Sequence, residues 1–171
     1  METKTRFWKE RLIVTELKQF LESHPNTAGV EVMMPDNNGI IRGKRIDIHE
    51  AESLFEKGLN FCAATPLLDS GGDVIDGLIL GSDDGDPDIY GHPIDGSLTP
   101  VPWLEKEMAQ VLITLVDRDG SPYPHEARNV LSRVIKRLAD DDLHATIAVE
   151  LEFYLYSDHD GLMVMPRHSP T

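Results

Sequence analysis

The chain has 171 residues, of which 40% are hydrophobic, and its formal net charge is −14. That length suits one ordinary domain, or a small domain with a piece of a second. The acidic excess disfavours binding to nucleic acid or to an anionic membrane, because both require a basic face. One cysteine, Cys62, excludes an internal disulfide and a multi-cysteine zinc site. There is no apolar run of membrane-spanning length and no apolar signal core, so we expect a soluble cytoplasmic protein with no nucleic-acid or membrane partner.

The first part of the chain predicts a helix, a hairpin and a second helix. Apolar residues recur at helical spacing from Phe7 to Glu22. Two β-rich runs, Val30 to Met34 and Ile40 to Ile46, flank an Asn-Gly pair that is typical of a tight hairpin turn. A short helix, about Ile48 to Glu56, is expected to end at Gly58 because glycine is a natural C-terminal cap.

Residues 59 to 100 are rich in Gly, Asp and Pro, and they predict a few short strands joined by long surface loops. The acidic run from Asp83 to Asp88 faintly resembles a calcium-binding loop. It lacks the spacing and the closing Glu of an EF-hand, so we interpret it as a solvated turn. Ala109 to Asp117 predicts a buried strand, and Pro122 and Pro124 indicate a domain boundary near residues 121–125.

Beyond this boundary the pattern predicts an amphipathic helix, Glu126 to Ala139, and then a strand, Val149 to Leu155. Because side chains alternate faces along a strand, Glu150 and Glu152 share one face, about 7 Å apart. Such a pair can bind two neighbouring divalent metal ions through oxygen. For an arbitrary Glu-x-Glu pair, the more common arrangement is the solvated outer face of a half-buried strand. One helix and one strand cannot complete a sheet domain, so we expect the second domain to be cut off.

Other polar residues give weaker signals. The seven histidines are scattered without metal-ligand spacing, and the chain has no glycine loop of the kinds that cradle phosphate. Arg42, Lys44 and Arg45 could face an anionic substrate. A solvated strand face, or an ion pair at a subunit contact, is the more common arrangement for such residues.

The order of these features resembles the amino-terminal third of a glutamine synthetase family enzyme, and within that family most resembles the γ-glutamylputrescine synthetase branch. The similarity runs from about residue 10 to about residue 157. Each matching stretch alone is weak evidence for the family, and the resemblance is specific because of the order and spacing of the stretches. The matching pieces are the Asp-x-x-Gly-x-x-Arg-Gly-Lys-Arg stretch from Asp36 to Arg45, Lys57-Gly58, Phe61, Gly96 to Pro100, Pro124 to Leu131 and Val149 to Leu155.

The resemblance implies an α+β fold, with a β-grasp domain over residues 1–122 and the first helix and strand of an incomplete catalytic domain over residues 123–171. It implies a ligase that uses ATP, with Mg²⁺ or Mn²⁺, to join an amine to the γ-carboxyl of glutamate through γ-glutamyl phosphate. Family members carry metal ligands on the Glu-x-Glu strand, and by position these are Glu150 and Glu152. The full-length protein would form a homo-oligomeric ring with active sites between subunits.

The loop after Phe61 bears on the choice of amine. Ammonia-using family members carry there an Asp-Gly-Ser-Ser run whose Asp helps to handle ammonium, and Cys62 stands at the position of that Asp. A thiol offers no fixed negative charge at neutral pH, and the loss of the carboxylate leaves room for a larger amine. Cys62 could equally be a small buried hydrophobe, and Asp69 could partly substitute for the missing carboxylate. We therefore expect a polyamine such as putrescine as acceptor, with Cys62, Thr65 and Asp69 on the amine-pocket loop.

Two alternatives stay open. The protein could be a glutamine synthetase that uses ammonia. The 171 residues could instead act as a binding or assembly module without catalysis, because the family's ATP site, remaining metal ligands and phosphate-binding arginines belong to sequence beyond Thr171. We expect this fragment alone to have no ligase activity and at best weak metal affinity, since two carboxylates make an incomplete site.

Overall fold

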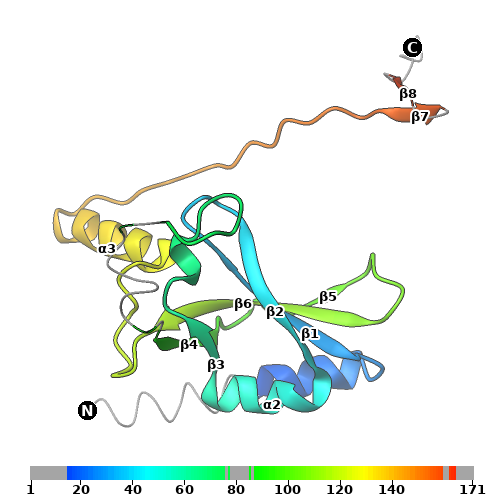
Figure 1. Cartoon of the computed structure of the whole chain (residues 1–171), viewed down its shortest axis with the longest axis horizontal. Helices are drawn as coiled ribbons and strands as arrows, with labels where there is room; N and C mark the ends of the chain where they lie inside the picture. Colours follow the sequence, from blue (N-terminus) through cyan, green and yellow to red (C-terminus); the bar gives the residue numbers. More distant parts are fainter. Residues whose placement is uncertain (1–14, 76, 78–84, 86, 160–161, 165–171) are drawn as a thin grey trace.

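A computed structural model of the chain describes residues 15–75, 77, 85, 87–159 and 162–164 (Figure 1). Its centre is a six-stranded sheet in the order β2-β1-β6-β4-β3, with β5 also pairing with β6. The long strand β6 is the common neighbour, because it pairs parallel with β1 and antiparallel with both β4 and β5. The strands are β1 (Gly29–Pro35), β2 (Ile41–Asp47), β3 (Leu59–Cys62), β4 (Asp88–Pro93), β5 (Thr99–Val101) and β6 (Met108–Val116).

The predicted first hairpin is confirmed by β1 and β2, which pair antiparallel from Gly29 opposite Asp47 to Pro35 opposite Ile41. The connection is longer than a two-residue turn: it spans residues 36–40, and Gly39 takes the left-handed φ of 78°. Alternate residues of β1 are fully buried, which places one face of the hairpin against the core.

The helical residues 15–23 and α2 (Ile48–Lys57) lie on the same side of the sheet (Figure 1). The part of the predicted first helix before residue 15 lies outside the described residues. In α2 the carboxylate of Asp47 caps the first turn by accepting a hydrogen bond from His49 N at 3.0 Å, and the helix ends at Gly58 as predicted. Across the described ranges of the chain, no helix is long and apolar enough to cross a membrane.

The hydrophobic core lies between these helices and the sheet. The predicted buried strand is confirmed by β6, in which Val111, Ile113 and Leu115 are fully buried on one face. The helices contribute Leu17, Leu54 and other apolar residues to the same cluster. A continuous core of this kind is the main source of the free energy that holds β1 and β6 in register.

The predicted short strands and loops between residues 59 and 100 are confirmed in β3, β4, β5 and a short 3-10 helix, η1 (Thr65–Leu67). The acidic run Asp83 to Asp88 lies in part outside the described residues, since Asp83, Asp84 and Asp86 are not among them. The comparison with a calcium loop therefore stays a sequence-based interpretation.

The predicted amphipathic helix is confirmed by α3 (Ala127–Asp140). Only its first turn is buried against the sheet, through Asn129. The apolar stripe farther along the helix is between 41% and 53% exposed, although a stripe of this kind normally packs against a core. The stripe consists of Val130, Leu131, Val134 and Ile135.

The predicted strand Val149 to Leu155 does not form in this structure. Residues 143–156 carry no secondary structure and run extended away from α3 (Figure 1), with Leu151 83% exposed. A strand requires a neighbour to exchange backbone hydrogen bonds, and no other described segment lies in register with this one. The chain then turns into a separate two-stranded sheet, β7 (Ser157–His159) with β8 (Leu162–Val164).

Gly43 of β2 provides a test of the hairpin packing. It lies opposite Met33, and a Cβ added there would overlap the backbone carbonyl oxygen of Val32. Because backbone cannot move aside without breaking the ladder, we expect Gly43→Ala to lower the free energy of unfolding by about 3 kcal/mol, measured by urea denaturation. Gly39→Ala is the matched control, since its Cβ meets nothing within 4 Å and costs only the left-handed conformation, about 1 kcal/mol. Equal losses in the two variants would contradict this account.

Candidate functional site

The three residues predicted for the amine pocket lie on one loop, residues 62–73, here called the β3 loop. Cys62 ends β3 and is half-buried, with its Sγ accepting a hydrogen bond from Ala64 N at 3.3 Å. Thr65 begins η1, and the buried Pro66 fixes that short helix against the core. Asp69 follows η1 and is half-buried. Cys62, Thr65 and Asp69 are thus close together in the sequence, on the loop that follows the edge strand β3.

The carboxylate of Asp69 organises the far end of the β3 loop. Its Oδ1 accepts hydrogen bonds from Gly71 N at 2.8 Å and from Asp73 N at 2.9 Å. The hydrogen bond from Asp73 is the main cause that lowers the pKa of Asp69 below its ordinary value, aided by those from Gly71 and Gly72 and by the charge of Arg42. Asp69 is thus an ionised group at neutral pH, and it is held in place by its own loop.

The connection between β1 and β2 (residues 36–40) and the first two residues of β2, together here called the β1–β2 turn, are built around the buried carboxylate of Asp36. Its Oδ1 accepts from Asn38 N and from Ile40 N, each at 2.8 Å, and its Oδ2 accepts from Arg42 Nε at 2.9 Å. Burial alone would raise the pKa of Asp36, but the hydrogen bonds from Arg42, Ile40 and Asn38, with the charge of Arg42, lower it below its usual value. The Asp-x-x-Gly-x-x-Arg spacing in the sequence is therefore the signature of this turn.

All three basic residues of β2 are engaged within the chain. Arg42 pairs with Asp36, and Arg45 pairs with Glu31 on the neighbouring strand. Lys44 donates to the Asn60 carbonyl oxygen at 2.6 Å, with its Nζ 4.9 Å above the ring of Phe61. The two ion pairs are internal to the hairpin, so Arg42 and Arg45 each have a carboxylate partner within the chain.

A polar joint, formed by Tyr123, Glu126 and Asn129, connects β6 to α3. Glu126 is completely buried, and its Oε2 accepts from Thr114 Oγ1 at 2.9 Å and from Leu115 N at 3.1 Å. Asn129 Nδ2 donates to the carbonyl oxygens of Leu115, at 2.9 Å, and of Tyr123, at 3.0 Å. Within the described parts of the chain, Glu126 Oε1 is buried without a hydrogen-bond partner. Burial is the main cause that raises the pKa of Glu126, against the hydrogen bonds from Leu115 and Thr114 and the charge of Arg128.

Sequence reasoning did not single out the polar joint or the contacts of the β1–β2 turn as candidate features. Both depend on residues far apart in the sequence: Arg42 reaches residue 69, and Glu126 reaches β6. The local signals were the Asp-x-x-Gly-x-x-Arg spacing for the turn and, for the polar joint, the position of Glu126 at the start of an amphipathic pattern.

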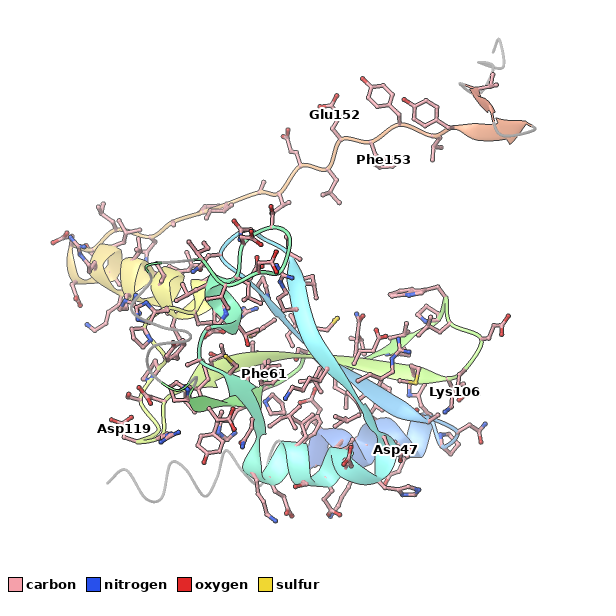
Figure 2. All side chains as sticks on the ribbon, in the orientation of Figure 1. Asp47, Phe61, Lys106, Asp119, Glu152 and Phe153 are labelled. Atoms are coloured by element: carbon pink, nitrogen blue, oxygen red, sulfur yellow. The ribbon has the colours of Figure 1, made fainter. Side chains whose placement is uncertain are left out.

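The predicted metal ligands Glu150 and Glu152 lie on the extended segment 143–156, and both are exposed. Figure 2 shows Glu152 on this segment, apart from Phe61 of β3, the residue before the β3 loop. Carboxylate oxygen is the donor that Mg²⁺ and Mn²⁺ prefer, so the donor type fits. Among the residues that the structure describes, no group of three or more His, Cys, Asp or Glu could hold a metal ion. Two carboxylates on their own make an incomplete coordination shell for either ion.

The six-stranded sheet with its helices matches the amino-terminal part of glutamine-synthetase-like structures. A solved structure of a novel glutamine synthase homolog matches with a TM-score of 0.57, over 67% of this chain and 27% of that chain. Its sequence identity is 22%, so this match shows the fold alone.

Sequence comparison extends the relationship. The chain is 42% identical to the γ-glutamylputrescine synthetase PuuA of Escherichia coli strain K12, over 88% of this chain and 32% of the relative. It is 29% identical to type-1 glutamine synthetase 2 of Dictyostelium discoideum, over 94% of this chain and 30% of the relative. The chain belongs to the glutamine synthetase family, and it spans about a third of the length of these curated relatives. A comparison with protein-family models gives no match.

The buried carboxylate of Glu126 predicts an unusual pH dependence of stability. A raised pKa means that the folded state binds the proton more tightly than the unfolded state. The free energy of unfolding should then fall as the pH rises from the ordinary value of 4.5 through the folded-state pKa, and stay level above it. Glu126→Gln removes the titration and keeps an acceptor for Leu115 N, so we expect it to lose this decline in urea denaturation between pH 4 and pH 8.

Glu126→Ala is the control for the hydrogen bonds themselves. It leaves Leu115 N without its carboxylate acceptor and also removes the titration, so we expect a loss of about 2 kcal/mol at pH 4 that becomes smaller as the pH rises. Identical pH profiles for the wild-type chain and for Glu126→Gln would show that Glu126 does not titrate as its burial requires.

Proposed function

We propose that the chain is part of an ATP- and metal-dependent ligase that joins a polyamine, such as putrescine, to the γ-carboxyl of glutamate through γ-glutamyl phosphate. The observation that carries this proposal is the 42% identity to a γ-glutamylputrescine synthetase over 88% of the chain, against 29% for a glutamine synthetase. The residues of the β3 loop support it, because Cys62 replaces a carboxylate that the ammonia-using branch carries.

In the proposed function, the β3 loop binds the amine substrate. The attacking group must be a free amine, so a bound ammonium has to lose a proton before it attacks the acyl phosphate. Asp69 is the acidic residue of this loop that we assign to the cationic substrate, since its hydrogen bonds keep it ionised. Cys62 and Thr65 would shape the amine pocket, and Cys62 would add no charge to it.

Glu150 and Glu152 would each ligate one of two divalent ions. Such ions neutralise the charge that develops on the transferring phosphoryl group. The role of the chain is to place two carboxylates on one face of a strand that forms once residues 149–155 acquire neighbours. The exposed apolar residues of this segment and of α3 support that picture, because a soluble protein seldom leaves such an area uncovered.

We further propose that residues 1–122 form a β-grasp domain and that residues 123–171 begin the catalytic domain. The parallel pairing of β1 with β6 at the middle of the sheet, with a helix packed on one side, supports the β-grasp assignment. The polar joint would then lie at the domain boundary. The full-length protein would act in the cytoplasm as a homo-oligomeric ring with active sites between subunits.

The amine is tested by assaying the full-length protein with putrescine and with ammonia, in the presence of ATP, glutamate and Mg²⁺. We expect kcat/KM for putrescine to exceed that for ammonia by about tenfold or more, because a pocket shaped for a long amine binds ammonia poorly. Faster turnover with ammonia would instead identify a glutamine synthetase. If neither putrescine nor ammonia leads to phosphate release, a binding or assembly module would be favoured instead.

The metal ligands are tested by the double substitution Glu150→Ala with Glu152→Ala. In the full-length protein we expect a loss of ligase activity of roughly 100-fold or more, with weaker Mn²⁺ binding by calorimetry. Glu105→Ala with Glu107→Ala is a matched control, since this is another exposed Glu-x-Glu pair, on the loop between β5 and β6. Micromolar Mn²⁺ binding by the 171-residue chain alone, abolished by the first double substitution, would overturn the expectation that this chain carries an incomplete site.

A further inference from the structure

The β1–β2 turn is hydrogen-bonded to the backbone carbonyl oxygens of the β3 loop. Three donors of the turn reach three carbonyl oxygens that lie within four residues of one another, between residues 66 and 69. The contacts are Asn37 N to Pro66 O at 3.2 Å, Asn38 Nδ2 to Leu68 O at 2.8 Å, and Arg42 Nη2 to Asp69 O at 2.7 Å. A further contact comes from the segment between β6 and α3, where the hydroxyl of Tyr123 donates a hydrogen bond to Ala63 O at 2.8 Å. The β3 loop is therefore hydrogen-bonded to two separate parts of the chain.

Arg42 is the residue that links the buried end of this turn to Asp69. Its Nε is fixed by the carboxylate of Asp36, which is itself fixed by two backbone amides, and its Nη2 is thereby directed at the loop. A planar guanidinium can make both hydrogen bonds at once, whereas a lysine ammonium at the same place cannot reproduce the fork. The guanidinium also lies close to the backbone of the loop, since a Cβ added to Gly72 would lie 3.2 Å from Arg42 Nη1.

We propose that Arg42 is a positioning residue that fixes the place of Asp69 in the amine pocket, and so sets the affinity for the amine. This inference rests on the proposed function, because it takes the β3 loop to be the surface that binds the amine. Arg42 does not touch the substrate in this account. It acts through the carbonyl oxygen of Asp69, and its charge also favours the ionised form of that carboxylate.

A purely structural role for Arg42 makes a different prediction. If the Asp36–Arg42 pair served only the stability of the fold, its loss would affect the affinities for glutamate, ATP and amine alike. If Arg42 positions Asp69, its loss should act on the amine alone. The separation of the three KM values is therefore the decisive measurement.

The test compares Arg42→Gln with Arg45→Gln in the full-length protein. Arg45 is a matched control, because it lies on the same strand and pairs with Glu31 rather than with the β3 loop. We expect Arg42→Gln to raise KM for the amine about tenfold, with KM for glutamate and ATP within about twofold of wild type, and Arg45→Gln to change none of them. Arg42→Lys should recover only part of the loss, since it keeps the charge without the fork.

Hydrogen exchange tests the contact itself. The amides of Gly71 and Asp73 donate to Asp69, so they should exchange about tenfold faster in Arg42→Gln and at the wild-type rate in Arg45→Gln. Asn38→Ala is a second variant that leaves the Asp36–Arg42 pair intact and removes the contact with Leu68 O. Because it keeps the contact of Arg42 with Asp69 O, Asn38→Ala should leave KM for the amine within about twofold of wild type. If Arg42→Gln fails to fold, Arg42→Lys, which keeps a cation beside Asp36, tests the inference by the same two measurements.

The outcomes separate the inference from the function on which it rests. Unchanged exchange in the β3 loop, an unchanged KM for the amine, or an equal rise in all three KM values would overturn the inference while leaving the ligase in place. A wild-type protein that turns over no amine would overturn the proposed function and the amine role of Arg42 together.

Discussion

Backbone hydrogen bonding to β6 is the constraint on which the rest of this structure depends. The strand accepts β1 in parallel on one edge and β4 and β5 antiparallel on the other, so its whole length is paired. A parallel pair cannot be joined by a tight turn, and the chain between β1 and β6 therefore has to carry other elements. That intervening chain contains α2, the β3 loop and the short strands. The placement of the candidate amine-pocket residues follows from how β1 and β6 are connected.

Two buried carboxylates, Asp36 and Glu126, stabilise neighbouring parts of the structure, and they do so by different means. Asp36 meets a cation and two backbone amides, so its ionised form is favoured and its pKa falls. Glu126 meets only neutral donors in its hydrogen bonds, so burial prevails and its pKa rises. The first carboxylate orders the β3 loop and the second joins the sheet to α3. Asn37 connects the two regions, because its side chain donates to His125 O at 3.3 Å while its amide donates to Pro66 O.

The ordered sheet and the exposed carboxy-terminal region differ in how they are stabilised. The sheet buries apolar side chains on both α2 and β6, whereas α3 and residues 143–156 present apolar side chains to solvent. Exposed apolar groups gathered in this way are typical of surfaces that bind another segment or chain. The proposed metal ligands Glu150 and Glu152 lie within this exposed region. The described residues include no group of three or more His, Cys, Asp or Glu that could hold a metal ion, whereas the β3 loop is held by hydrogen bonds from the β1–β2 turn.

The sequence by itself determined the elements whose causes are local. Periodicity and turn residues predicted the β1–β2 hairpin, α2 with its Gly58 cap, the buried strand β6 and the helix α3, because each depends on side chains a few positions apart. Only the tertiary structure decided the rest. The alternation from Val149 to Leu155 is that of a strand, yet no strand forms without a partner to complete its hydrogen bonds. The contact of Arg42 with Asp69 and the burial of Glu126 join distant parts of the chain, and no local pattern encodes which distant carbonyl or amide a polar side chain will meet.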